Sequence, residues 1–278
     1  MAYIDIGEPD RPVDAVFLHA NGFNALTYRQ ILAPLAPRYR ILAVDQRGHG
    51  NSTLDTDADG RRNWLDLRDD LLAFLAAAGL KNVVLAGHSM GATASVLAAG
   101  QEPGRCRRLA LFDPVILPPN HGIIPEESPM VLAAERRRAT FPSRESVLAS
   151  YRGRGAFRTW PDAILKDYVT AGFRELPGGE VTLTCTPRWE ASGFAAHGHD
   201  PWEAISRSKC PMDILRAETG STFHMADGSA FDPTRVRITT VPGSTHFLPM
   251  ERPDLIQATL SAAIDADVQT DFRETVPV

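Results

Sequence analysis

The sequence predicts an α/β fold in which a mostly parallel central sheet carries helices on both faces. Three observations support this prediction. Short apolar runs alternate with helix-like patterns along the chain. The runs are almost continuously apolar, as in strands that are buried on both sides. At 278 residues, the chain is also long enough for one large α/β domain with an inserted segment.

The expected strands are six apolar runs, at 15–20, 39–45, 82–87, 108–113, 212–217 and 236–241. The clearest expected helix covers 63–80, where apolar residues recur at helical spacing. Asn63 can cap the start of this helix, and Gly79 can end it. A second helix is expected to begin at Ser89, and a third covers about 252–266.

The alternation of strands and helices stops between Val115 and about Ser208. This stretch has helical patterns, joints rich in proline and glycine, and no convincing buried strand. We therefore expect a mainly helical cap at 115–208, inserted into a core made of residues 1–114 and 209–278. A run of arginines within the cap, at 136–138, has acidic residues around it, so we expect it to be a solvated helix face.

Composition and charge exclude several classes of partner. The net charge of −5 and the pI near 5.9 argue against nucleic acid, because phosphate binding needs a basic face. No apolar run approaches the length of a membrane span, and the first ten residues lack the basic region of a secretory signal. Three widely spaced cysteines fit reduced thiols better than a disulfide framework. We expect a cytoplasmic protein with a small-molecule substrate, and no nucleic acid or membrane partner.

The strongest local signal is Gly87-His88-Ser89-Met90-Gly91, between an expected strand and an expected helix. A Gly-x-Ser-x-Gly sequence there allows a tight turn that projects the serine above the sheet. Serine needs a base within hydrogen-bond reach. His246 is the best candidate, because it follows a late strand and precedes the last helix, which places it above the carboxyl edge of the sheet.

The other histidines fit the role of base less well. His88 lies in the turn itself but points along a different direction from Ser89, so we keep it only as a candidate substrate contact. His49 lies in a loop where packing explains it better, and His224 is a second choice. The sequence HGHD at 197–200 has the look of metal ligands but has no partner ligands elsewhere. We expect no metal and no cofactor.

Four motifs in order make the chain resemble the α/β-hydrolase superfamily over nearly its full length apart from the insertion. They are FLHANGF at 17–23, VDQRGHGNS at 44–52, the GHSMG turn, and VPGSTHFLPMERP at 241–253. The resemblance implies an oxyanion hole made by the backbone N–H groups of Asn21 and Met90. The family usually has two strands before the first motif, whereas MAYIDIG has room for one. We expect the first strand to be missing, and a homodimer that completes the sheet edge is one alternative.

The catalytic acid is not at the position where the family usually has it. Beyond the expected strand at 212–217 the family often reads Gly-x-x-Asp, and this chain has Gly220 there. Haloalkane dehalogenase-like members instead place the acid at the end of the preceding strand, just before the cap. Asp113 stands at that spot, and we expect Pro114 to hold it extended. We prefer Asp113, and Glu218 and Asp227 stay open.

The resemblance to dehalogenases does not extend to their chemistry, because they have aspartate where this chain has Ser89. A triad of Ser89, His246 and Asp113 predicts a serine hydrolase that cleaves a carboxylic ester or related acyl bond. Alternatives are carbon–carbon bond hydrolysis, lactone opening, cofactor-free peroxidation, and a receptor that turns over slowly. Aromatic residues of the cap are candidate substrate contacts: Trp160, Phe173, Trp189, Phe194 and Trp202.

Overall fold

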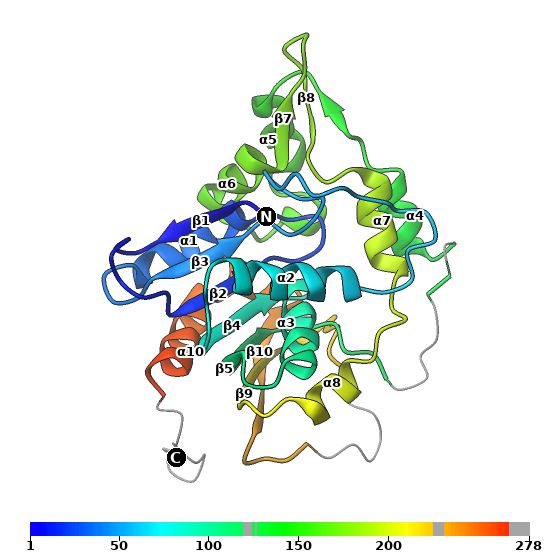
Figure 1. The fold of residues 1–278 in the computed structure, drawn as a ribbon. Helices are drawn as coiled ribbons and strands as arrows, with labels where there is room; N and C mark the ends of the chain where they lie inside the picture. Colours follow the sequence, from blue (N-terminus) through cyan, green and yellow to red (C-terminus); the bar gives the residue numbers. More distant parts are fainter. Residues whose placement is uncertain (119–123, 126, 225–230, 267–278) are drawn as a thin grey trace.

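The computed structural model describes residues 1–118, 124–125, 127–224 and 231–266. Seven strands form the central sheet in the order β1-β3-β2-β4-β5-β9-β10 (Figure 1). β1 pairs with β3 in antiparallel orientation, and the other neighbours are parallel, which confirms the predicted α/β fold. The strands are β1 Tyr3–Ile6, β2 Ala15–Leu18, β3 Ile41–Val44, β4 Val83–His88, β5 Cys106–Phe112, β9 Met212–Thr219 and β10 Val236–Thr245.

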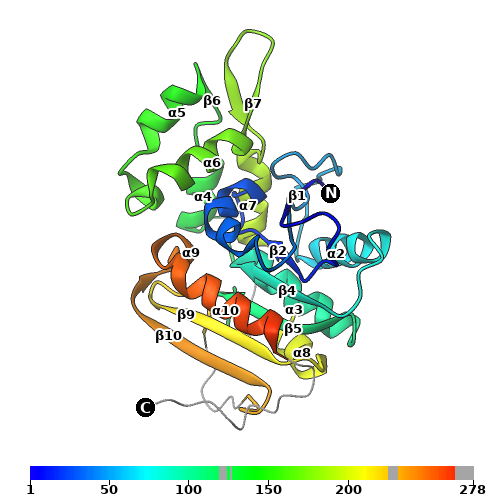
Figure 2. The same cartoon turned by 90° about the vertical axis from the view of Figure 1, so that its left-hand side faces the viewer.

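Helices cover both faces of this sheet, because successive side chains of each buried strand point to opposite faces. Phe17 of β2 packs into the apolar cluster that contains the residues of α10, whereas Val16 packs into the cluster that contains the residues of α2 and α3. Figure 2 shows α10 on one face and α3 on the other. The core helices are α1 Arg29–Leu32, α2 Leu65–Ala77, α3 Met90–Gln101, α9 Leu248–Glu251 and α10 Pro253–Asp265, with 3₁₀ turns at Ala25–Tyr28 and Ala33–Leu35.

The segment between β5 and β9 forms a cap-like insertion. Its helices are α4 Pro129–Glu135, α5 Arg144–Tyr151, α6 Asp162–Gly172, α7 Pro187–Ala195 and α8 Pro201–Arg207, with a 3₁₀ turn at Gly155–Phe157. The first four lie on the side of the sheet where β4 ends, whereas α8 packs on α3 of the core (Figure 1). The contact between α8 and α3 is close, since a Cβ added at Gly100 would lie 2.6 Å from the Cα of Ala204.

The expectation that the cap has no buried strand was wrong. β6 (Thr140–Phe141), β8 (Val181–Leu183) and β7 (Phe173–Glu175) form a three-stranded antiparallel sheet in that order. Phe141, Val181 and Leu183 bury their side chains in the same apolar cluster as the cap helices. Strands of two or three residues are too short to show the alternation by which a strand is recognised in a sequence.

The described helices include none that is both long and apolar enough to cross a bilayer.

Candidate active site

Ser89 stands in a strained turn between β4 and α3, with φ 54° and ψ −120°. Glycine is required on both sides of this turn by close contacts. A Cβ at Gly87 would lie 2.7 Å from the amide nitrogen of Ala92, and a Cβ at Gly91 would lie 2.5 Å from the carbonyl oxygen of Leu18. The Gly-x-Ser-x-Gly sequence therefore serves the turn that projects the Ser89 hydroxyl from the sheet.

The structure brings the three predicted catalytic residues together at the carboxyl ends of β4, β5 and β10. The Ser89 Oγ lies 3.0 Å from Nε2 of His246. On the other side of the ring, Nδ1 of His246 lies 2.6 Å from Oδ2 of Asp113. Because parallel strands present their carboxyl ends at one edge, three residues separated by up to 157 positions meet within hydrogen-bond distance.

The Asp113 carboxylate is fully buried and accepts hydrogen bonds from β9 and from the loop that follows it. Its Oδ1 accepts hydrogen bonds from the Ala217 amide at 2.9 Å and the Ser221 hydroxyl at 2.6 Å. Its Oδ2 accepts one from the Thr222 amide at 3.1 Å. Burial acts to raise the pKa of Asp113, but His246, Ser221 and Ala217 outweigh burial and lower this pKa. Asp113 is therefore a carboxylate that can orient His246 and stabilise its positive charge.

The backbone conformation of the acid differs from the prediction. The expectation that Asp113 is extended was wrong, because its φ is +44°. The Asp113 amide still donates to the Leu215 carbonyl of β9, at 2.7 Å. The chain turns sharply at Asp113, and the positive φ belongs to this turn. Glu218 is exposed and accepts a hydrogen bond from the Gly243 amide at 2.9 Å, which ties the end of β9 to β10. Asp227 lies outside the described residues.

His88 lies beneath the site and does not line the cavity. Its Nε2–H donates to the carbonyl oxygen of His246 at 2.7 Å, so Nδ1 accepts from the Tyr28 hydroxyl at 2.7 Å. The same Tyr28 oxygen accepts from the Ala20 amide at 3.2 Å. Burial, with a smaller effect from nearby His246, lowers the pKa of His88 to about 3. A neutral, fully buried His88 thus links the loop after β2 to the backbone that carries His246.

The two predicted oxyanion donors come from adjacent segments. Met90 is in the first turn of α3, where its N–H has no acceptor within the helix. Asn21 lies in the loop after β2. This loop packs closely on the turn of Ser89, since a Cβ added at Gly91 would lie 2.6 Å from the His19 carbonyl oxygen. The next residue, Gly22, has φ +74° and donates its N–H to Nε2 of His49 at 3.0 Å. The Asn21 side chain donates to the Glu190 carbonyl at 2.8 Å, so the cap contacts this loop.

A cavity of about 650 Å³ lies between the core and the cap over Ser89 and His246. Phe194 lines it, as predicted from the sequence. Trp160 instead packs with Phe23 in the core, at 5.1 Å between ring centroids, and Trp189 donates its indole N–H to the Arg47 carbonyl at 3.0 Å. Most of the wall is apolar. Residues that the sequence analysis did not propose as substrate contacts also line it: Phe23, Trp64, Val115, Leu117, Met130, Arg137, Phe157, Tyr168, Glu190 and Phe247.

The histidines of the HGHD sequence pack as rings in this region. His199 stacks on Trp64 with 4.7 Å between centroids, and His197 lies 4.9 Å from the same ring. Burial, with smaller effects from His197 and Arg61, lowers the pKa of His199 to about 3. Within the described part of the chain, no group of three or more histidine, cysteine, aspartate or glutamate residues is arranged to hold a metal ion.

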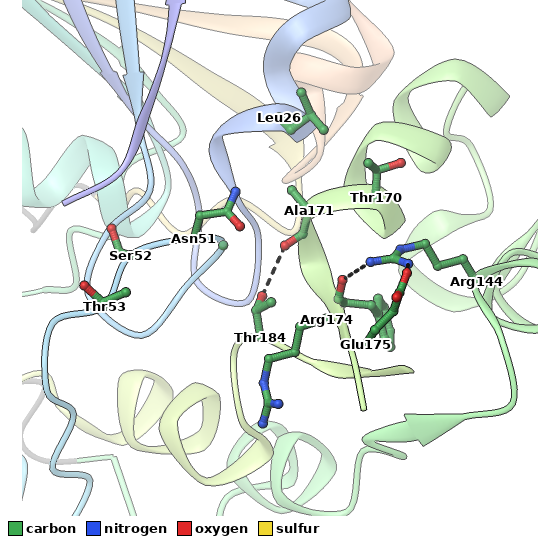
Figure 3. Close-up of a pocket in the computed structure, with 12 residues that line it drawn as sticks. Leu26, Asn51, Ser52, Thr53, Arg144, Thr170, Ala171, Arg174, Glu175 and Thr184 are labelled. Carbon is green, nitrogen blue, oxygen red and sulfur yellow. Dashed lines mark hydrogen bonds and ion pairs between the residues drawn. The ribbon is translucent and has the colours of Figure 1, made fainter. Parts of the chain in front are cut away.

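A second pocket of about 580 Å³ lies between the core loop 50–53 and the cap (Figure 3). Arg144 points into it and is already paired with Glu175 at 2.8 Å, and it also donates to the Phe173 carbonyl at 2.8 Å. The Thr184 hydroxyl donates to a backbone carbonyl on the same wall. Neither Ser89 nor His246 lines this pocket, and both line the larger cavity.

Comparison with known protein families agrees with this geometry. Residues 15–258 match the model of the alpha/beta hydrolase family. The chain belongs to this family. The match covers the turn of Ser89, Asp113 and His246 as well as the cap-like insertion, so the protein is a hydrolase of α/β-hydrolase fold.

Relatives of this hydrolase have different activities. The 2-(acetamidomethylene)succinate hydrolase of Mesorhizobium japonicum is 24% identical over 90% of this chain and 87% of its own. A haloalkane dehalogenase of Sphingobium indicum is 29% identical over 95% of this chain and 91% of its own. The crystal structure of an E-2-(acetamidomethylene)succinate hydrolase superposes with a TM-score of 0.77 at 24% identity, covering 94% of both chains. At this identity the superposition establishes the fold.

Proposed function

We propose that the protein is a serine hydrolase that cleaves a carboxylic ester or a related acyl bond of a small, partly apolar substrate. The observation that carries the proposal is the continuous hydrogen-bond chain from Ser89 through His246 to Asp113, with distances of 3.0 and 2.6 Å. A serine hydroxyl next to an imidazole that a buried carboxylate orients is the arrangement for covalent acyl transfer.

In this mechanism, the Ser89 Oγ attacks the acyl carbon while Nε2 of His246 accepts the hydroxyl proton. The negative charge that develops on the acyl oxygen is stabilised by the N–H groups of Asn21 and Met90. His246 then gives its proton to the leaving group, which departs and leaves an acyl-enzyme on Ser89. A water molecule, deprotonated by His246, releases the acid by the same steps in reverse order.

The residue at the turn between β4 and α3 argues against dehalogenation. Attack of a serine on a haloalkane would leave an alkyl ether, which has no carbonyl carbon for water to attack. A carboxylate at that position would leave an ester, which water can hydrolyse. Ser89 is therefore suited to substrates that already carry an acyl carbon.

The size and lining of the cavity support a small substrate. A volume of about 650 Å³ with mostly apolar walls accommodates a molecule of modest size, oriented by a few polar groups. The relative from Mesorhizobium japonicum, whose name gives a small acetamido-substituted succinate as its substrate, is consistent with this size class.

The test is multiple-turnover release of p-nitrophenol from acetate and butyrate esters, measured for the wild type and for Ser89→Ala. We expect turnover in the wild type and none above background in the variant. Ser206→Ala is the matched control, because Ser206 is exposed on α8, and its activity should equal the wild type. A stoichiometric burst without turnover on every acyl substrate tested would instead indicate a receptor and refute the proposal.

A further inference from the structure

Arg137 lies in the wall of the active-site cavity, unlike its two neighbours. Arg136 and Arg138 are exposed, whereas the side chain of Arg137 retains 18% of its accessible surface. The prediction that the run 136–138 is a solvated helix face was therefore wrong in two respects, since the run follows the end of α4 at Glu135 and Arg137 is not solvated like its neighbours. Its partners come from other segments of the cap, which the local sequence pattern does not reveal.

The Arg137 guanidinium joins three cap helices. Nη1 pairs with Oε2 of Glu190 on α7 at 2.8 Å. Nη2 donates to the hydroxyl of Tyr168 on α6 and to the hydroxyl of Tyr151 on α5, the second at 3.3 Å. Desolvation acts to lower the pKa of Arg137, but Tyr168 and Glu190 outweigh it and raise this pKa, so the side chain stays a cation. Loss of this cation would leave the Glu190 carboxylate without its charge partner.

Two of these partners, Glu190 and Tyr168, bind the loop after β2, which carries Asn21. The backbone carbonyl of Glu190 accepts the Asn21 side-chain N–H at 2.8 Å. The Tyr168 hydroxyl, which accepts from Arg137, keeps its own hydrogen to donate to the Gly22 carbonyl at 3.3 Å. The carbonyl of Tyr168 accepts the Asn24 side-chain N–H at 3.0 Å. The loop after β2 is thus bonded to the two cap helices that Arg137 connects.

The packing of Glu190 against this loop is equally close. A Cβ added at Gly22 would lie 2.4 Å from Oε1 of Glu190, so the carboxylate rests directly on the backbone of the loop. Gly193, one turn later on α7, packs on the Asn21 side chain, with an added Cβ 2.7 Å from Nδ2. A shift of α7 would therefore move the backbone next to the predicted oxyanion donor.

We propose that Arg137, through its ion pair with Glu190 and its bond to Tyr168, is a positioning residue for the oxyanion hole. This inference rests on the proposed function, because it assigns the Asn21 N–H to the oxyanion. The cap then does more than roof the cavity, since it fixes the angle at which the Asn21 amide faces the acyl oxygen. Because this hydrogen bond strengthens as the oxyanion forms, loss of Arg137 acts on kcat rather than on KM.

The test compares Arg137→Met/Glu190→Gln, Arg137→Lys and, as matched control, the exposed Arg136→Ala. The double variant removes both charges, so neither is left buried alone. We expect its kcat to fall about 10- to 100-fold, less than the roughly 10²- to 10³-fold for loss of an oxyanion donor, with KM within about threefold. Arg137→Lys keeps the charge but not the planar fork, so it should recover part of the lost kcat. Arg136→Ala should match the wild type.

Hydrogen exchange gives a second readout that does not require activity. The backbone amides of residues 19–24 should exchange faster in the double variant than in the wild type, while those of the cap sheet β6-β8-β7 should not change. If the double variant does not fold, kcat and hydrogen exchange are measured on Arg137→Lys instead. Both should change in the same directions as expected for the double variant, but by less.

Three outcomes separate the two proposals. Absence of any acyl turnover in the wild type refutes the proposed function, and unchanged exchange at residues 19–24 then refutes the positioning role as well. Turnover that depends on Ser89 but stays within twofold of wild type in the double variant refutes only the positioning role. A rise in KM with kcat unchanged also refutes it, because Arg137 would then bind the substrate rather than position the loop.

Discussion

Replacement of Asp113 by asparagine tests the assignment of the catalytic acid through hydrogen-bond directions. Oδ1 of Asp113 accepts two donors, from Ala217 and Ser221, so the single amide oxygen of asparagine belongs at that position. The NH₂ group then takes the place of Oδ2 and faces Nδ1 of His246, at 2.6 Å in the wild type. A donor there makes Nδ1 the acceptor and moves the ring proton to Nε2, which can no longer accept the Ser89 proton.

The expected loss in Asp113→Asn is on the order of 10⁴ in kcat, or about 5 kcal/mol in the activation barrier. The same NH₂ group also faces the Thr222 amide, which donates to Oδ2 at 3.1 Å in the wild type. Two opposed donors in a buried site should lower the free energy of unfolding by about 1–3 kcal/mol.

The assay is kcat on one p-nitrophenyl ester, with urea unfolding of the same samples. Glu218→Gln is the control, because Glu218 is exposed and bonds only to the Gly243 amide among its described contacts. Its kcat should stay within about twofold of the wild type. A large loss in Glu218→Gln beside a small loss in Asp113→Asn would refute the assignment.

Three further predictions concern the surroundings of the triad. In urea unfolding, Gly91→Ala should lower the free energy of unfolding by more than about 2 kcal/mol, because its Cβ would lie 2.5 Å from a β2 carbonyl oxygen. Gly178→Ala is the control, since nothing lies within 4 Å of its added Cβ, and it should change this free energy by less than about 0.5 kcal/mol. His88 has a folded pKa of about 3, below its unfolded value near 6.5, so the stability it contributes is complete above about pH 6.5 and is lost as pH falls toward 3. His88→Phe should therefore reduce the slope of unfolding free energy between pH 4 and 6 by up to about 1.4 kcal/mol per pH unit, and an unchanged slope would contradict a neutral buried His88. We expect Phe194 to contact the acyl chain, so Phe194→Ala should raise KM for a butyrate ester by about 3- to 30-fold more than for an acetate ester. Equal changes in KM for the two esters would refute this contact.

The parts of this molecule that the sequence predicted well are those where local chemistry decides the structure. The turn at Ser89 requires glycine at 87 because a Cβ there would meet the backbone of Gly91 and Ala92, only a few residues away. The strands of the core are long enough for their apolar character to be recognised. Asp113 could be placed because it ends an apolar strand at the spot where the resemblance to haloalkane dehalogenase-like members puts the acid, whereas its positive φ could not be predicted, since it depends on pairing with β9.

The features that the sequence did not reveal depend on contacts between distant segments. Arg137 and its exposed neighbours have the same residue type, and what distinguishes Arg137 is its bonds to partners 14 to 53 positions away. Ser221 and Thr222 stand in the loop where the family usually has its acid, and here they donate to an acid on the neighbouring strand. A short polar pair directly after Gly220 was the available signal for this role.

The central claim is that Ser89 becomes acylated during turnover, and rapid-quench mass spectrometry tests it most directly. Wild-type protein mixed with p-nitrophenyl acetate and quenched in acid within the first turnovers should carry one acetyl group, on the peptide that contains Ser89. The adduct should be absent from Ser89→Ala. If His246→Ala is acylated chemically at Ser89, its deacylation should be slower, so the adduct should persist longer than in the wild type. Turnover without any adduct, or an acetyl group on another residue that disappears at the rate of turnover, would contradict the account.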